Sequence, residues 1–85
     1  MSFSLAPHVS MTDMGQSLVL LNERSGGYWL LNATGAVVVR LLLQGVSVPE
    51  VVAQLGRSHP ASVHRIPTDV EKLLVSLREA RVVTP

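Results

Sequence analysis

The sequence has no cysteine, which excludes a disulfide framework and a thiolate metal site and is consistent with a reducing compartment. It also has no long hydrophobic run. The longest nearly apolar run, residues 36–43, is interrupted by Arg40 and is far too short to span a membrane. The first residues lack the basic and apolar segments of a secretory signal. We therefore expect a cytoplasmic protein with no membrane partner.

The residues that usually carry catalysis are also scarce. The three histidines are His8, His59 and His64, and no acidic residue lies beside the last two at the spacing of metal ligands. A zinc site needs three or four converging ligands. The glycines lack the Lys-Ser/Thr pattern of a phosphate loop, and no nucleophile motif is present. We expect no catalytic residues, no metal and no cofactor, and hence a protein that is not an enzyme.

Charge is sparse and balanced. Charged residues make up 15% of the chain and the formal net charge is +1. Nucleic-acid binding depends on clustered positive charge, and the one weakly basic patch is formed by Arg57, His59, His64 and Arg65. We interpret this patch as a loop in water, and we expect no nucleic-acid partner.

Length and hydropathy favour one small domain that covers residues 1–85 and presents a binding surface. The apolar fraction is 47% and the mean hydropathy is +0.36. A chain of this size buries only about 60% of its surface on folding. Some apolar surface is therefore expected to stay outside the core, where it can dock a partner.

Turn residues divide the first third of the chain into three expected strands. They cover residues 4–11, 16–22 and 28–31, with turns at residues 12–15 and 23–27. Pro7 would confine the first strand to a sheet edge. Residues 16–22 and 28–31 are expected to form an antiparallel hairpin.

Three helices are expected after the strands. The first follows the cap Asn32 and ends near Gln44, before Gly45, although its valine run has strand propensity. The second begins after the cap Ser47, with Glu50 closing a capping box, and ends at Gly56. Residues 57–66 are expected to form a polar loop.

The third helix has the clearest pattern. It is expected to begin at Pro67 or Thr68 with a second capping box, and its apolar residues recur at helical spacing. Val82 and Val83 are expected to add a short terminal contact. The predicted fold is α+β and winged-helix-like, with a three-stranded antiparallel sheet followed by three helices.

Two of the three aromatic residues lie in the expected strand 28–31. Alternation places Trp29 and Leu31 on one face and Tyr28 and Leu30 on the other. We expect Leu31 and Trp29 to face the core. The last strand of the hairpin is expected to be a sheet edge, and edge strands can accept another strand.

The order and spacing of several short segments resemble the PqqD-like peptide-recognition domains of ribosomal peptide-modification pathways. The likeness covers residues 17–84 and departs from the family at Arg81, where glycine is commoner. The matching segments are Tyr28-Trp29-Leu30-Leu31-Asn32-Ala33-Thr34-Gly35-Ala36, Leu41-Leu42-Leu43-Gln44-Gly45-Val46-Ser47, Glu50-Val51-Val52, Leu55, Asp69-Val70, Leu73-Leu74, Leu77 and Ala80-Arg81-Val82-Val83.

Stand-alone domains of this size look most like those of lasso-peptide biosynthesis. The resemblance implies a protein that binds the leader of a precursor peptide as an added strand, against the third helix. It implies delivery of that leader to a separate transglutaminase-like cysteine peptidase, with an asparagine-synthetase-like cyclase as a further partner. The candidate peptide-binding residues are Tyr28, Trp29, Leu30, Asp69, Lys72, Leu73 and Ser76.

Two other functions remain open at this point. A winged-helix DNA-binding regulator would need basic side chains on the third helix, which carries Lys72 and Arg78 against three acidic residues. A small structural subunit that stabilises an enzyme is the other alternative.

Two of the candidate peptide-binding residues also have a purely structural explanation. Leu73 belongs to the apolar face of the third helix, and Asp69 suits the first turn of a helix.

Overall fold

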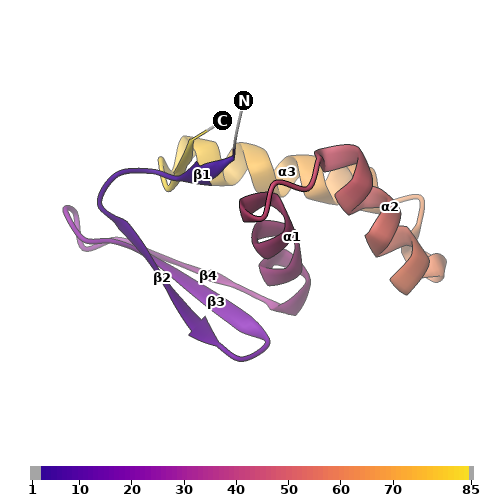
Figure 1. The fold of residues 1–85 in the computed structure, drawn as a ribbon, viewed down its shortest axis with the longest axis horizontal. Helices are drawn as coiled ribbons and strands as arrows, with labels where there is room; N and C mark the ends of the chain where they lie inside the picture. The colour runs from indigo at the N-terminus through magenta and orange to yellow at the C-terminus, as the bar shows by residue number, and fades with distance from the viewer. Residues whose placement is uncertain (1–2, 85) are drawn as a thin grey trace.

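The fold, seen in a computed structural model that describes residues 3–84, places a small sheet beside a group of helices (Figure 1). Strands β2 (Val9–Met14), β3 (Ser17–Asn22) and β4 (Tyr28–Leu31) form an antiparallel sheet in the order β2-β3-β4. Helices α1 (Ala33–Leu43), α2 (Val48–Ser58) and α3 (Ile66–Glu79) follow. The predicted α+β arrangement is confirmed.

The single strand expected at residues 4–11 is wrong, because the chain turns at Pro7 and at His8, where φ is 69°. The part before the turn is β1 (Ser4–Leu5), which pairs with the terminal strand β5 (Val83–Thr84). This pairing confirms the expected terminal contact.

The turn expected at residues 12–15 is also misplaced, because β2 continues to Met14. Met14 pairs with Ser17 across a two-residue hairpin, and Gly15 adopts the positive φ of 86° that a type II′ turn requires at its first position. Asp13 belongs to the strand, and its Oδ1 accepts a hydrogen bond from the Gly15 N–H at 2.8 Å. Arg40 of α1 donates to the same Asp13 oxygen and to the Gly15 carbonyl, which ties this hairpin to the helix.

Capping explains why the valine-rich segment forms α1 as predicted. Asn32 Oδ1 accepts from the Gly35 N–H at 2.8 Å. At the other end Gly45 has φ of 94°, and the Val46 N–H donates to the Leu41 carbonyl in a Schellman motif. Burial of Val38 and Val39 against the sheet and the other helices then outweighs their strand propensity.

Helix α2 is longer than the sequence predicted. Ser47 Oγ accepts from the Glu50 N–H at 3.3 Å, as expected, but the Glu50 carboxylate pairs with Arg57 at 3.0 Å and does not close the capping box. Gly56 does not end the helix, because its φ is not positive and it packs close to Val63. The expected loop 57–66 therefore begins with the last turn of α2 and also contains the 3-10 turn η1 (Pro60–Ser62).

Helix α3 begins at Ile66, earlier than the predicted Pro67 or Thr68, and Thr68 closes no capping box. Arg65 occupies the cap position and makes no capping side-chain bond. Burial of Ile66 in the core, with Pro67 in the first turn where proline is tolerated, explains the earlier start.

The core has two parts, and α1 contributes to both. One part packs the inner face of the sheet against α1 and the end of α3, with Leu18, Leu20 and Leu77 fully buried. The other part joins α1, α2 and the first half of α3. This packing fixes α3 relative to β4.

The C-terminal end of α3 contains a residue in an unfavourable backbone conformation. Arg81 has φ of 60°, and the Val82 N–H donates to the Leu77 carbonyl at 3.2 Å, as in a Schellman motif. Glycine is preferred there because it has no Cβ to collide with the backbone.

Replacing Arg81 by Gly is therefore expected to raise the free energy of unfolding by about 1 kcal/mol, measured by chemical denaturation. The matched change Arg78→Gly, inside α3, should lower it by about 1 kcal/mol. A loss of stability in Arg81→Gly would contradict this account of the helix end.

Candidate peptide-binding groove

The edge of β4 is open. Within residues 3–84, β4 pairs with β3 alone. The N-terminal strands lie elsewhere, because β2 covers the opposite edge of β3 and β1 pairs with β5. Strand β4 also contains no lysine, proline or bulge, which are the usual devices that block an edge. A further strand can therefore pair with it.

The register identifies which backbone groups of β4 face this open edge. The Asn22 N–H donates to the Gly27 carbonyl at 2.8 Å, and antiparallel pairs alternate between hydrogen-bonded and non-hydrogen-bonded. Trp29 and Leu31 therefore bond to β3, opposite Leu20 and Leu18. The N–H and C=O groups of Tyr28 and Leu30 point outward.

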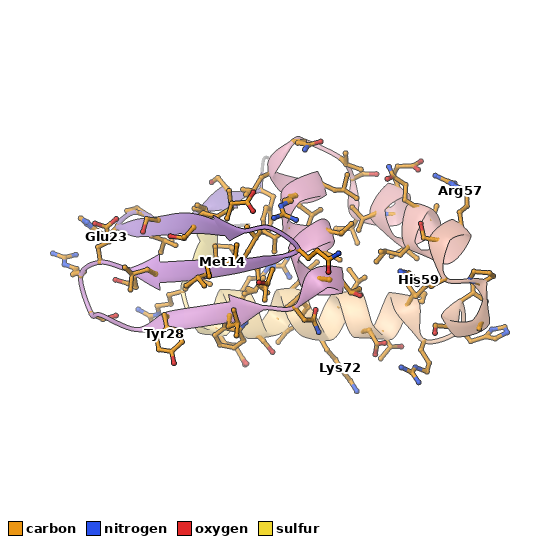
Figure 2. All side chains as sticks on the ribbon, turned by 90° about the horizontal axis from the view of Figure 1, so that it is seen from below. Met14, Glu23, Tyr28, Arg57, His59 and Lys72 are labelled. Atoms are coloured by element: carbon orange, nitrogen blue, oxygen red, sulfur yellow. The ribbon has the colours of Figure 1, made fainter. Side chains whose placement is uncertain are left out.

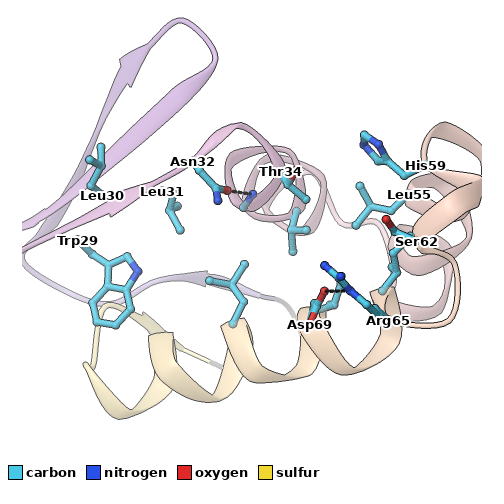
Figure 3. A pocket seen from close by; sticks show the side chains of 15 residues that line it. Trp29, Leu30, Leu31, Asn32, Thr34, Leu55, His59, Ser62, Arg65 and Asp69 are labelled. Carbon is cyan, nitrogen blue, oxygen red and sulfur yellow. Dashed lines mark hydrogen bonds and ion pairs between the residues drawn. The ribbon is translucent and has the colours of Figure 1, made fainter.

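A groove of about 490 Å³ lies between β4 and α3 (Figure 3). Its apolar part combines side chains of β4, α1 and α3. The lining residues are Trp29, Leu30, Leu31, Asn32, Thr34, Gly35, Val38, Leu55, His59, Ser62, Arg65, Ile66, Asp69, Val70 and Leu73. The open edge and the helix are thus two sides of one concave surface.

Polar side chains lie at the end of the groove beyond Leu31. Arg65 Nε and Asp69 Oδ2 are 4.0 Å apart, and both side chains are more than half exposed, so they form a weak ion pair. His59 and Ser62 come from the end of α2 and from η1 (Figure 3). This end can therefore contact polar or charged parts of a ligand.

Four of the seven residues predicted for peptide binding line the groove: Trp29, Leu30, Asp69 and Leu73. The other three do not. The Tyr28 side chain is 73% exposed on the outer face of the sheet, so its contribution to the edge comes from its backbone. Lys72 points away from the protein (Figure 2), and Ser76 is half-buried outside the groove.

Sequence reasoning missed the part of the groove built by α1, α2 and η1. Asn32 was assigned only as a cap, and Arg65 and His59 only as a solvated loop. The positions of Arg65 and His59 depend on packing of α2 against α3, for which the sequence gives no local signal. Leu55 and Val70 lie on the apolar faces of α2 and α3, so helical periodicity could have indicated them.

The face of the sheet turned away from the helices is uncovered and carries several exposed apolar side chains. Tyr28 and Leu30 are 73% and 64% exposed, and Met14 is 59% exposed (Figure 2). Leu21, paired with Tyr28, is also exposed. We call these four residues the outer patch. Exposed apolar side chains on one face are typical of an interaction surface.

The described residues offer no alternative site for metal chemistry. In residues 3–84, no group of three or more His, Asp or Glu side chains comes together in a way that could hold a metal ion. Over the same residues, no helix has the length and apolar character needed to cross a membrane.

Comparison with known proteins assigns the chain to a family. Residues 17–83 match the family described as Coenzyme PQQ synthesis protein D (PqqD). The chain belongs to the PqqD family. The resemblance seen in the sequence is thereby confirmed, over almost the same residues. No curated protein sequence matches the PqqD-family chain.

Two solved structures are similar to this PqqD-family protein. One is a lasso peptide synthetase B1 complexed with the leader peptide, at 34% identity and a TM-score of 0.90, covering 100% of both chains. The other is TbiB1 in complex with the TbiA(beta) leader peptide. It is 21% identical with a TM-score of 0.84, covers 94% of this chain and 93% of that one, and supports the fold.

Proposed function

We propose that this PqqD-family protein binds the leader of a ribosomally made precursor peptide, of the lasso-peptide type, as a fourth strand beside β4. The observation that carries the proposal is the open edge of β4 beside the groove formed with α3. The similar lasso peptide synthetase B1, which was solved with a leader peptide, supports the same ligand class.

The two parts of the site contribute differently. An added strand exchanges up to four backbone hydrogen bonds with Tyr28 and Leu30, each worth about 0.5–1.5 kcal/mol net. These backbone hydrogen bonds do not depend on which side chains the leader carries. The apolar groove adds burial of leader side chains, and the combination suits a sub-micromolar complex, about −8 kcal/mol or stronger.

The protein would act by delivery and without catalysing a reaction itself. It would hold the leader, leave the core peptide free, and present the scissile region to a separate transglutaminase-like cysteine peptidase, with an asparagine-synthetase-like cyclase as a further partner. The gain is a high effective concentration of substrate at the enzyme. Three members of the outer patch support this role, because the side chains of Met14, Leu21 and Tyr28 are exposed and line no part of the groove.

Replacing Met14 by Glu in the outer patch is expected to leave leader affinity within about twofold, since Met14 lies on β2 and lines no part of the groove. It should slow leader removal by the peptidase about tenfold, because a charge then opposes an apolar contact. Val48→Glu, at an exposed apolar residue of α2 away from the sheet, is the control for added charge. Unchanged cleavage with Met14→Glu would contradict docking of the peptidase there.

A DNA-binding function is not favoured. Helix α3 would have to enter a groove of the duplex, yet it carries Lys72 and Arg78 against Asp69, Glu71 and Glu79. One of its faces is packed in the core and part of the remainder forms the groove wall beside β4.

Calorimetric titration with a synthetic leader, taken from a short precursor gene beside this one, tests the proposal. We expect sub-micromolar binding by the leader and none by the core peptide. Salt-sensitive binding to duplex DNA with no leader binding would favour a regulator. Co-purification with an enzyme that does not depend on the leader would favour a structural subunit.

A further inference from the structure

The sheet has a second open edge, on the side opposite the groove. Within residues 3–84, the order β2-β3-β4 leaves β2 paired with β3 alone. Figure 2 shows β2 and β4 as the two borders of the sheet, with α3 behind the border formed by β4. The helices contact the sheet mainly through β3 and β4. The outer edge of β2 is therefore accessible to another strand.

The register identifies the backbone groups of β2 that face this edge. Met14 pairs with Ser17 across a two-residue turn, and the pair that closes such a turn is hydrogen-bonded. Antiparallel pairs alternate, so Met14 and every second residue before it bond to β3. The Glu23 N–H donates to the His8 carbonyl at 2.7 Å, in agreement with this alternation. The N–H and C=O groups of the other residues of β2 point outward: Val9, Met11 and Asp13.

The edge of β2 lacks most of the devices that prevent pairing between sheets. The strand contains no lysine or proline, and its residues pair with β3 without a bulge. Asp13 is its one charged residue, and an inward-pointing charge can block an edge. Here the Arg40 guanidinium of α1 lies 3.0 Å from the Asp13 carboxylate and neutralises it within the protein. The edge is therefore regular and carries no uncompensated charge.

From these observations we propose that the β2 edge is an interface for the β2 edge of a second copy of this chain. The outward-facing residues lie symmetrically about Met11. In antiparallel pairing about a twofold axis at Met11, Val9 lies opposite Asp13 of the second copy, and every outward-facing residue is paired. About six backbone hydrogen bonds join the two strands. The two Asp13 carboxylates do not face each other, so like charges are not opposed.

The side chains fit this register. Met11 is 42% exposed and lies opposite its own copy, so two apolar side chains cover each other. On the outer face of the sheet Ser10 lies opposite Thr12 of the second copy, and such hydroxyl pairs stabilise antiparallel sheets. The continuous sheet that results keeps a β4 edge at each border. The interface therefore leaves both grooves open and stands independently of the proposed function.

Cysteine cross-linking tests the pairing and its register, since the chain has no cysteine. Two Met11→Cys residues would form a hydrogen-bonded pair with Cα atoms about 5.5 Å apart, which suits a disulfide. Oxidation should convert most of this variant to a covalent dimer.

Met14→Cys is the matched control for this cross-link. Met14 is more exposed than Met11, at 59% against 42%, so random collisions would favour it. The proposed register separates the two copies of Met14 by about 20 Å along the strands, so cross-linking should fall at least tenfold. Equal cross-linking of the two variants, or none with Met11→Cys, would overturn the proposal.

Sedimentation equilibrium of two proline variants assigns the interface to one edge. The contact is small, so the wild-type mass should rise from 9.2 kDa toward twice that value with a dissociation constant of about 10–100 µM. Met11→Pro removes an N–H at the centre of the β2 edge and keeps the bonds to β3, so it should stay monomeric. Leu30→Pro removes the corresponding N–H of β4 and should dimerise like the wild type.

Two results of the sedimentation experiment would overturn the β2 interface. One is a wild-type protein that remains at 9.2 kDa up to about 1 mM. The other is a dimer that Leu30→Pro abolishes and a folded Met11→Pro protein keeps, since copies would then meet through β4. Circular dichroism shows whether each variant is folded, and the Met11→Cys cross-link decides the matter if Met11→Pro is not.

Discussion

Replacing Leu31 by Glu is expected to unfold the protein. Leu31 is 2% exposed and packs in the core with Leu18, Leu20 and Leu77. Losing its side-chain packing costs about 2–5 kcal/mol, and burying an unpaired carboxylate adds to that. A domain of 85 residues has a total stability of roughly 4–13 kcal/mol, so most molecules should lose their fold, as measured by circular dichroism and chemical denaturation.

The neighbouring change Leu30→Glu is the control. Leu30 is 64% exposed, so the fold should remain, with a free energy of unfolding within about 1 kcal/mol of the wild type. Leader binding should weaken, since Leu30 lines the groove at the open edge. A folded Leu31→Glu protein, or an unfolded Leu30→Glu protein, would contradict the assigned faces of β4.

Replacing Leu30 by Pro is expected to weaken leader binding about 100-fold. The Leu30 N–H faces the open edge, so proline removes a donor that the leader would use and leaves the hydrogen bonds between β3 and β4 in place. An unpaired leader carbonyl, with the proline ring in its way, costs about 2–3 kcal/mol. Titration calorimetry measures the loss, and amide spectra show whether the domain is folded.

The matched variant Leu30→Ala keeps the N–H and removes only the side chain. It should lose much less affinity than Leu30→Pro. Equal losses for the two variants would show that the side chain of Leu30, and not its backbone, carries the interaction.

The best-predicted parts of the fold were those specified by local chemistry. Strand β4 was predicted with the bounds that the structure has, and α1 within one residue, because glycine turns and the Asn32 cap mark their ends. The alternation of Leu31 and Leu30 correctly separated a buried face from an exposed one. The resemblance to the PqqD family, carried by the order and spacing of short segments, was also confirmed.

The less well predicted parts depend on tertiary contacts. Burial of Ile66 moves the start of α3, and the Glu50–Arg57 pair and close packing of Gly56 let α2 continue. The polar end of the groove, with Arg65 and His59, arises only when α2 and η1 fold beside α3. No periodicity along the chain marks these residues as neighbours of β4.

Amide hydrogen exchange of β4, followed by nuclear magnetic resonance, tests the open edge most directly. In the free protein the Trp29 and Leu31 amides should exchange slowly, and those of Tyr28 and Leu30 fast, because only the first pair bonds to β3. Saturation with the synthetic leader should slow Tyr28 and Leu30 at least tenfold. Fast exchange that persists at both of these amides under saturating leader would contradict strand addition at β4.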